Sequence, residues 1–130
     1  MLKLYPNDVK LVFKNFPLRS HQFAEAAGLA ALAAGKQGKF WQMHDAIFEN
    51  YNKLNNEKIT ELAQQIGLDM VKFEADSNDT QLKKQVQLDL QSGYAAGVRG
   101  TPTLFVNGRR VKQRSVEGLR QMVDKELANR

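Results

Sequence analysis

The chain has 130 residues, with 19 Lys+Arg against 14 Asp+Glu, and so carries a formal net charge of +5. This length suits one domain, and 42% hydrophobic with 25% charged residues is typical of a globular protein rather than a disordered or collagen-like one. Because the sequence contains no cysteine, we expect no disulfide, thiolate nucleophile, iron–sulfur cluster or cysteine-based zinc site. With only 2 histidines and no HExxH motif, we expect neither a metal nor another cofactor.

The first predicted elements are a strand and a helix. Val9–Asn15, with the sequence VKLVFKN, reads as a strand buried on both faces, because it is a β-branched and aromatic run bounded by Pro17. Ser20 is the expected N-cap of an alanine-rich helix that runs to about Ala34. No membrane-spanning run or signal peptide is expected, since Pro6 and Asp8 interrupt the first ten residues.

A block of helices follows. The apolar spacing predicts a helix over Lys39–Tyr51, with Phe40, Trp41 and Phe48 in the core, and another over Glu57–Ile66. Two further helices are expected, with N-caps at the residues Asp69 and Asn78, the second reaching about Ala96. The two histidines, His21 and His44, are interpreted as structural rather than as proton carriers, since no nucleophile or paired acid lies at a telling spacing.

The last part of the chain predicts a hairpin and a helix. Thr103–Val106 is strand-like, Asn107-Gly108 is a strong two-residue hairpin signal, and Arg109–Gln113 can return antiparallel. Ser115 is the expected cap of the final helix, whose buried stripe is predicted to be Val116, Leu119, Val123 and Leu127.

The positive charge is concentrated in this last part. No acidic residue occurs between Asp89 and Glu117. The interval holds the basic residues Arg99, Arg109, Arg110, Lys112 and Arg114. The basic segment Arg99–Arg114 is either a solvated hairpin edge or a surface that binds an acidic partner. Nucleic acid is not the expected partner, because few aromatic side chains are interleaved with the basic ones.

Three stretches of the sequence resemble one known family. KLVFKNFPLRSHQFAEAA (Lys10–Ala27), GKFWQMHDAIFEN (Gly38–Asn50) and GVRGTPTLFVNGRRV (Gly97–Val111) are similar to the DsbA-like thioredoxin family of disulfide oxidoreductases. The resemblance implies an α/β thioredoxin-like fold with an inserted helical domain. It also implies a single domain over residues 1–130, with a mostly helical insert at 20–96 and the ββα end of the fold at 97–130. Proteins of this family are extracytoplasmic or periplasmic, whereas the location of this chain stays unknown.

The sequence departs from the family at its start. The first strand and most of the first helix, which carries Cys-x-x-Cys in the family, are absent, so the resemblance implies a fold truncated at the N-terminus. Thiol–disulfide exchange needs a thiolate, and we therefore expect no catalytic residue and no redox activity.

The resemblance implies one binding site. In thioredoxin-like proteins the proline that matches Pro102 follows a cis peptide bond beside the redox cysteines. The residues Gly100, Thr101 and Pro102 would then bind an extended peptide or unfolded protein, with the main chain of Thr101 facing outward. The alternative is that Pro102 only shapes the start of the following strand.

The missing first strand would also leave two strand edges open. In the family it lies between the strands that correspond to Val9–Asn15 and Thr103–Val106. Three outcomes remain open: the two strands pair directly, a second copy covers the edges in a homodimer, or the helical block becomes the main body beside a small sheet remnant. Of these, a homodimer is the outcome we favour from sequence.

Overall fold

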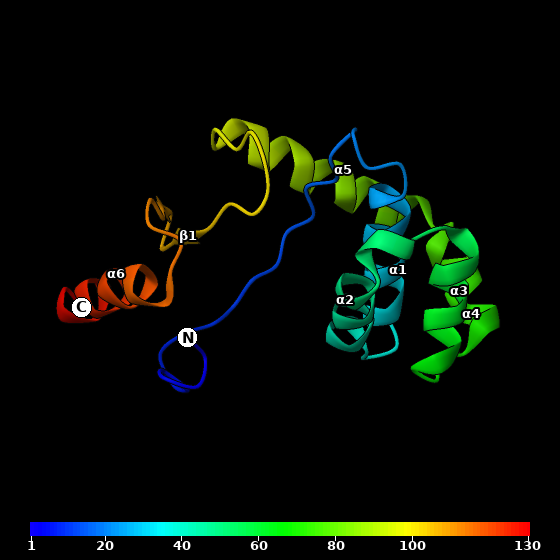
Figure 1. Ribbon diagram of the computed structural model, residues 1–130, viewed down its shortest axis with the longest axis horizontal. Coiled ribbons are helices and arrows are strands. Elements are labelled where there is room, and N and C mark those ends of the chain that lie inside the picture. Colours follow the sequence, from blue (N-terminus) through cyan, green and yellow to red (C-terminus); the bar gives the residue numbers. More distant parts are fainter. The chain divides into compact units, whose positions relative to one another are not determined.

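The computed structural model describes all residues from Met1 to Arg130. Its elements are α1 Ala24–Gly35, α2 Phe40–Glu49, η1 Tyr51–Lys53, α3 Asn56–Gln65, α4 Met70–Ser77, α5 Thr80–Ala95, β1 Phe105–Val106, β2 Arg109–Arg110 and α6 Val116–Ala128 (Figure 1). The chain divides into two compact units. We call Asn15–Gly97 the helical unit, and Met1–Lys14 together with Val98–Arg130 the hairpin unit.

The helical unit is built around α1. Ala33 and Ala34 of this helix are fully buried, and their small side chains let α2, α3, α4 and α5 pack closely against it. Met43 of α2 is also fully buried and fills the space that the alanines leave. The remaining core side chains include Ile47, Ile59, Leu62, Ala63, Leu68 and Phe73. The alanine-rich stretch is therefore a buried helix, as its composition predicts.

The helix starts follow capping chemistry, with two corrections. Asp69 accepts a hydrogen bond from the Lys72 amide, which confirms it as the cap of α4. The cap of α5 is Asp79 rather than Asn78, because the Asp79 carboxylate accepts a hydrogen bond from the main-chain N–H of Gln81. The expected cap at Ser20 is wrong, since α1 begins at Ala24 and has no side-chain cap at all.

Burial along α2 is narrower than its sequence predicts. Phe40 packs partly against the core, but Trp41 is 42% exposed and Phe48 is 58% exposed. Their assignment to the core is wrong. Residues 41 and 48 are seven apart and therefore share a helix face, but at 3.6 residues per turn that face lies about 130° around the helix from the one that carries Met43 and Ile47.

A buried carboxylate joins the start of the helical unit to α5. Asp89 is only 9% exposed, and its side chain accepts the main-chain N–H of Asn15 at 3.1 Å and the Gln85 amide at 2.9 Å. Burial of a charged group is tolerated when hydrogen bonds satisfy it. This contact fixes Asn15, where the helical unit begins.

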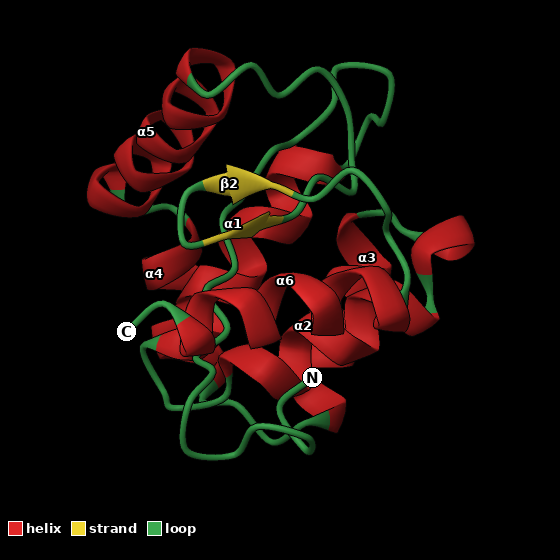
Figure 2. Cartoon of the chain, turned by 90° about the vertical axis from the view of Figure 1, so that its left-hand side faces the viewer, coloured by secondary structure: helices red, strands yellow, loops and turns green.

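The hairpin unit holds the sheet and the last helix. Phe105 pairs with Arg110 and Val106 with Arg109 in an antiparallel ladder of two short strands, the only arrows in Figure 2. The helix α6 packs against β1 and buries Val123. The Ser115 hydroxyl accepts from the Gly118 amide at 3.0 Å, which confirms the predicted cap.

The buried stripe of α6 starts later than predicted. Val116 is 67% exposed, so its assignment to the stripe is wrong. The first buried position is Gly118, where a side chain would collide with the carbonyl oxygen of Gln113. The turn before α6 thus folds down onto the helix at the residue that has no side chain.

The predicted strand Val9–Asn15 is the main error of the sequence-based expectations. These residues are extended but belong to no ladder, and Leu11 and Val12 are 52% and 64% exposed. A strand exists only when a neighbouring strand takes its main-chain groups, and the sheet contains no third strand. Val9–Asn15 does not pair directly with Thr103–Val106. The result is a mostly helical chain with one small two-stranded sheet.

Candidate functional site

The loop that precedes β1 contains the three predicted site residues. Thr101 and Pro102 are exposed, and the peptide bond between them is cis, the isomer that the resemblance implies. The Thr103 hydroxyl donates a hydrogen bond of 2.6 Å to the carbonyl of Gly100, across the base of the loop. The main-chain N–H and C=O of Thr101 make no hydrogen bond within the chain.

The hairpin brings the basic residues back to this loop. Asn107 and Gly108 both adopt positive φ, +47° and +79°, as a tight two-residue turn requires. The Val111 amide donates to the Leu104 carbonyl at 2.8 Å, one position beyond the two-residue ladder. The segment that follows the turn therefore runs back alongside the residues that follow Pro102.

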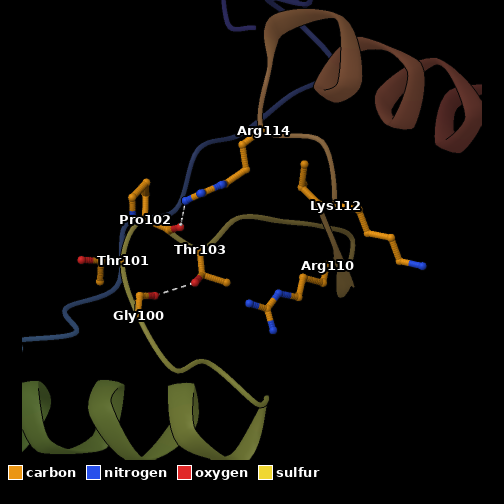
Figure 3. Close-up of a pocket in the computed structure, with 8 residues that line it drawn as sticks. Gly100, Thr101, Pro102, Thr103, Arg110, Lys112 and Arg114 are labelled. Atoms are coloured by element: carbon orange, nitrogen blue, oxygen red, sulfur yellow. Dashed lines mark hydrogen bonds between the residues drawn. The ribbon is translucent and has the colours of Figure 1, made fainter.

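These segments border a solvent-open pocket of about 510 Å³. Its lining consists of Gly100, Thr101, Pro102, Thr103, Arg110, Val111, Lys112 and Arg114 (Figure 3). The Arg114 guanidinium reaches over the loop and donates to the Pro102 carbonyl at 2.6 Å. Arg110 extends toward Thr103, whereas the end of the Lys112 side chain points away from the loop. No carboxylate lines the pocket.

The basic segment divides into two parts. Arg110, Lys112 and Arg114 line the pocket. Arg109 lies outside it, with its guanidinium 3.4 Å from the Glu126 carboxylate. Arg99 also lies outside the lining. From sequence, the loop at Thr101-Pro102 and the basic segment Arg99–Arg114 are alternative sites. The structure places Arg110, Lys112 and Arg114 of the basic segment around the same pocket as the loop. The Asn107-Gly108 signal could have revealed this, because it predicts a chain reversal between them.

The other candidate residues lie in the helical unit and do not join this pocket. His21 is exposed in the turns before α1. The ring of His44 lies among those of Trp41 and Phe48, at centroid distances of 5.1 and 4.7 Å, and its Nδ1 is 3.0 Å from an Asp45 oxygen. These contacts account for His44 as a structural residue. No three His, Asp or Glu side chains gather as metal ligands would.

Comparison with known proteins places the chain in a family. A family model described as thioredoxin matches residues 3–125. The chain belongs to the thioredoxin-like family. A solved structure of a thioredoxin-like oxidoreductase from Silicibacter pomeroyi superimposes with a TM-score of 0.76, covering 92% of this chain and 69% of that one. At 22% sequence identity, this likeness shows the fold.

The curated proteins to which this thioredoxin-like chain is similar include proteins named as Na(+)/H(+) antiporters. It is 35% identical over 103 residues to the Na(+)/H(+) antiporter NhaA 3 of Salinispora tropica, covering 78% of this chain and 16% of that protein. It is 34% identical over 108 residues to the antiporter NhaA of Herminiimonas arsenicoxydans, covering 83% and 17%. The chain therefore spans about a sixth of the length of these relatives. None of its own helices combines the length and apolarity that a bilayer crossing requires.

Proposed function

We propose that this chain is a redox-inactive, DsbA-like binding domain that holds an extended peptide at the loop Gly100–Thr103. One observation carries the proposal: Thr101 presents an unpaired main-chain N–H and C=O from an exposed position. Hydrogen bonds on both sides, Thr103 to Gly100 and Arg114 to Pro102, hold the surrounding loop in place. An extended peptide pairs with such groups as an added strand.

The absence of redox activity follows from composition. Thiol–disulfide exchange proceeds by attack of a thiolate on a disulfide sulfur, and this chain has no cysteine to supply one. We expect the pure chain to give no turnover in an insulin-reduction or dithiol-oxidation assay. Turnover above the buffer rate would contradict the proposal.

Main-chain pairing has a signature that tests the peptide site. Successive amides of a strand point to opposite sides, so a single N-methyl group on the peptide should abolish binding at one position and spare it at the next. The measurement is fluorescence polarisation with a labelled Val/Thr-rich peptide and its singly N-methylated versions. Equal effects at neighbouring positions would overturn the proposal. Pro102→Ala should weaken binding without changing its salt dependence.

A second candidate is that Arg99–Arg114 binds an acidic partner through charge alone. What favours it is a pocket lining that includes Arg110, Lys112 and Arg114 but no carboxylate. Binding of this kind weakens as salt screens the charges. It should also be insensitive to N-methylation of the ligand. Steep loss of affinity with salt, with no alternation along the peptide, would select this candidate.

Two arginines provide a matched pair for separating the candidates. Arg114 lines the pocket and contacts the Pro102 carbonyl, while Arg99 belongs to the same basic segment and lies outside the lining. If the pocket is the site, Arg114→Ala should weaken binding and Arg99→Ala should not. If net charge alone attracts the partner, the two substitutions should have equal effects.

A further inference from the structure

The turn between β1 and β2 is the one place in the sequence where a glycine follows an asparagine. Asn107 and Gly108 are both exposed and lie in the loop that joins the two arrows in Figure 2. The main-chain N–H of Gly108 makes no hydrogen bond within the chain. No atom lies within 4 Å of the position that a side chain of Gly108 would occupy. The Gly108 nitrogen is therefore accessible, and nothing shields it from the side chain of the preceding asparagine.

Few contacts hold the turn rigid. Each of the two strands beside it is 2 residues long. The Asn107 side-chain amide donates to the Glu126 carboxylate at 3.4 Å, and the Arg109 guanidinium lies 3.4 Å from the same carboxylate. A hairpin with so few contacts opens at a low cost in free energy. The Asn107 side chain can therefore leave Glu126 and reach the Gly108 nitrogen.

We propose that Asn107 is a site of spontaneous deamidation. The main-chain nitrogen of Gly108 gives its proton to hydroxide and attacks Cγ of Asn107, which closes a succinimide ring. The bond between Cγ and Nδ2 breaks, and Nδ2 leaves as ammonia with a proton taken from water. Water then adds to one of the two ring carbonyls and breaks the bond between that carbonyl and the ring nitrogen. In total, water is consumed, ammonia is released and nothing is oxidised or reduced.

The ring opens to two products with different effects on the hairpin. Addition of water at the side-chain carbonyl leaves an ordinary aspartate. Addition at the main-chain carbonyl leaves an isoaspartate, whose main chain runs through Cγ and is one carbon longer. The tight two-residue turn does not accommodate a longer main chain, so the isoaspartate should break the ladder. Both products place a carboxylate beside Glu126 in place of an N–H donor, and like charges repel.

The hairpin brings Lys112 and Arg114 back beside the loop at Thr101. Loss of the ladder should release the Val111 amide from the Leu104 carbonyl, which it now contacts at 2.8 Å. Deamidation is then a slow and irreversible loss of the pocket. Its effect on peptide binding rests on the proposed function, whereas the modification and its effect on the hairpin do not.

Peptide mapping of the full chain tests the modification. Trypsin cuts after Arg99 and Arg109 and so releases Asn107 in the peptide Gly100–Arg109, which contains no other asparagine. After incubation of the folded chain in mildly alkaline buffer, this peptide should gain the mass expected when an amide becomes an acid. It should also separate by chromatography into two species of equal mass, the aspartate and the isoaspartate. Conversion should be slower in mildly acidic buffer, because the attack requires a deprotonated nitrogen.

The chain contains its own controls. Asn52 and Asn78 are also exposed, but neither precedes a glycine, and their peptides should keep their mass in the same digest. Asn107→Gly is the matched variant, since glycine adopts a positive φ readily and has no amide to lose. After incubation, the Val111 amide should exchange hydrogen faster in the wild type than in Asn107→Gly. The wild type should also bind the peptide less tightly than this variant.

A second variant separates charge from main-chain length. Asn107→Asp carries the charge of the ordinary product without the longer main chain. Before incubation it should keep more of the hydrogen-exchange protection at Val111 than the isoaspartate form does. Equal loss of protection in the two would show that charge, and not the longer main chain, opens the hairpin.

Two results would overturn the deamidation site. One is a Gly100–Arg109 segment that stays unmodified in the folded chain while a synthetic peptide of the same sequence converts. The other is conversion at Asn52 and Asn78 as fast as at Asn107. Unchanged exchange at Val111 after conversion would overturn the effect on the hairpin. If the fresh chain binds no peptide, the proposed function fails, and the mass and exchange measurements still decide this inference.

Discussion

The helical unit and the hairpin unit bury their apolar side chains very differently. The helical unit has a continuous core that runs from the alanines of α1 through Met43 to Phe73. In the hairpin unit the buried apolar side chains are Val98, Val111 and Val123. The first unit has the interior of an ordinary small domain, while the second is mostly surface. The candidate binding pocket belongs to the second unit.

This contrast predicts where the chain is most sensitive to mutation. Met43→Ala deletes a fully buried side chain of the helical core and should lower the free energy of unfolding by about 2–5 kcal/mol. Val71→Ala is the control, because Val71 is 83% exposed on α4, and it should change the value by less than about 0.5 kcal/mol. Urea unfolding followed by circular dichroism measures both. Equal effects would mean that the helical unit lacks a close-packed core.

Helix caps test whether the two units unfold separately. Ser115 caps α6 and Asp79 caps α5, and replacement of either by Ala should cost about 1 kcal/mol. Hydrogen exchange should then become about fivefold faster only in the helix whose cap has been removed. Each variant is the control for the other. If Ser115→Ala speeds exchange equally in α5 and α6, the two units unfold as one, and they differ in burial but not in stability.

The smallest expected effect concerns alkaline pH in the hairpin unit. The Tyr5 hydroxyl donates to Asp124, and this hydrogen bond, with a smaller contribution from burial, raises the pKa of Tyr5 above its ordinary value of 10.0. A raised pKa favours the protonated phenol in the folded state. The stabilisation is therefore present below pH 10.0 and is lost as pH rises through the higher folded pKa.

Tyr5→Phe should remove this loss. The free energy of unfolding of the Tyr5→Phe variant should fall less steeply with rising pH than that of the wild type above pH 10.0. Tyr51→Phe, at a tyrosine that is 74% exposed, is the matched control. A Tyr5→Phe profile parallel to the wild-type profile would show that the bond to Asp124 does not contribute.

Sequence reasoning succeeded where structure depends on neighbours along the chain. Asp69, Ser115 and Asn107-Gly108 act through hydrogen bonds or backbone angles within a few residues, and their predicted roles are confirmed. The exposed aromatics show the limit. The helical spacing of Trp41 and Phe48 says that they share a face, but it does not say whether another helix covers that face.

The larger error concerns a partner distant in sequence. Val9–Asn15 has the composition of a buried strand, but strand formation depends on a neighbour that the sheet does not contain. The loop at Thr101 stays a prediction as a binding site, and its proximity to Arg110 and Arg114 is a finding of the structure. That proximity depends on the chain reversal at Asn107-Gly108.

The pocket lining falls within a single stretch of chain, Gly100–Arg114. Most binding sites gather residues from distant segments, so altering their specificity requires coordinated changes. Here one short replacement between Gly100 and Arg114 exchanges the whole pocket lining and leaves the core of the helical unit untouched. Related chains could diversify their ligands in this stretch alone, and a protein engineer could graft or randomise it as one cassette.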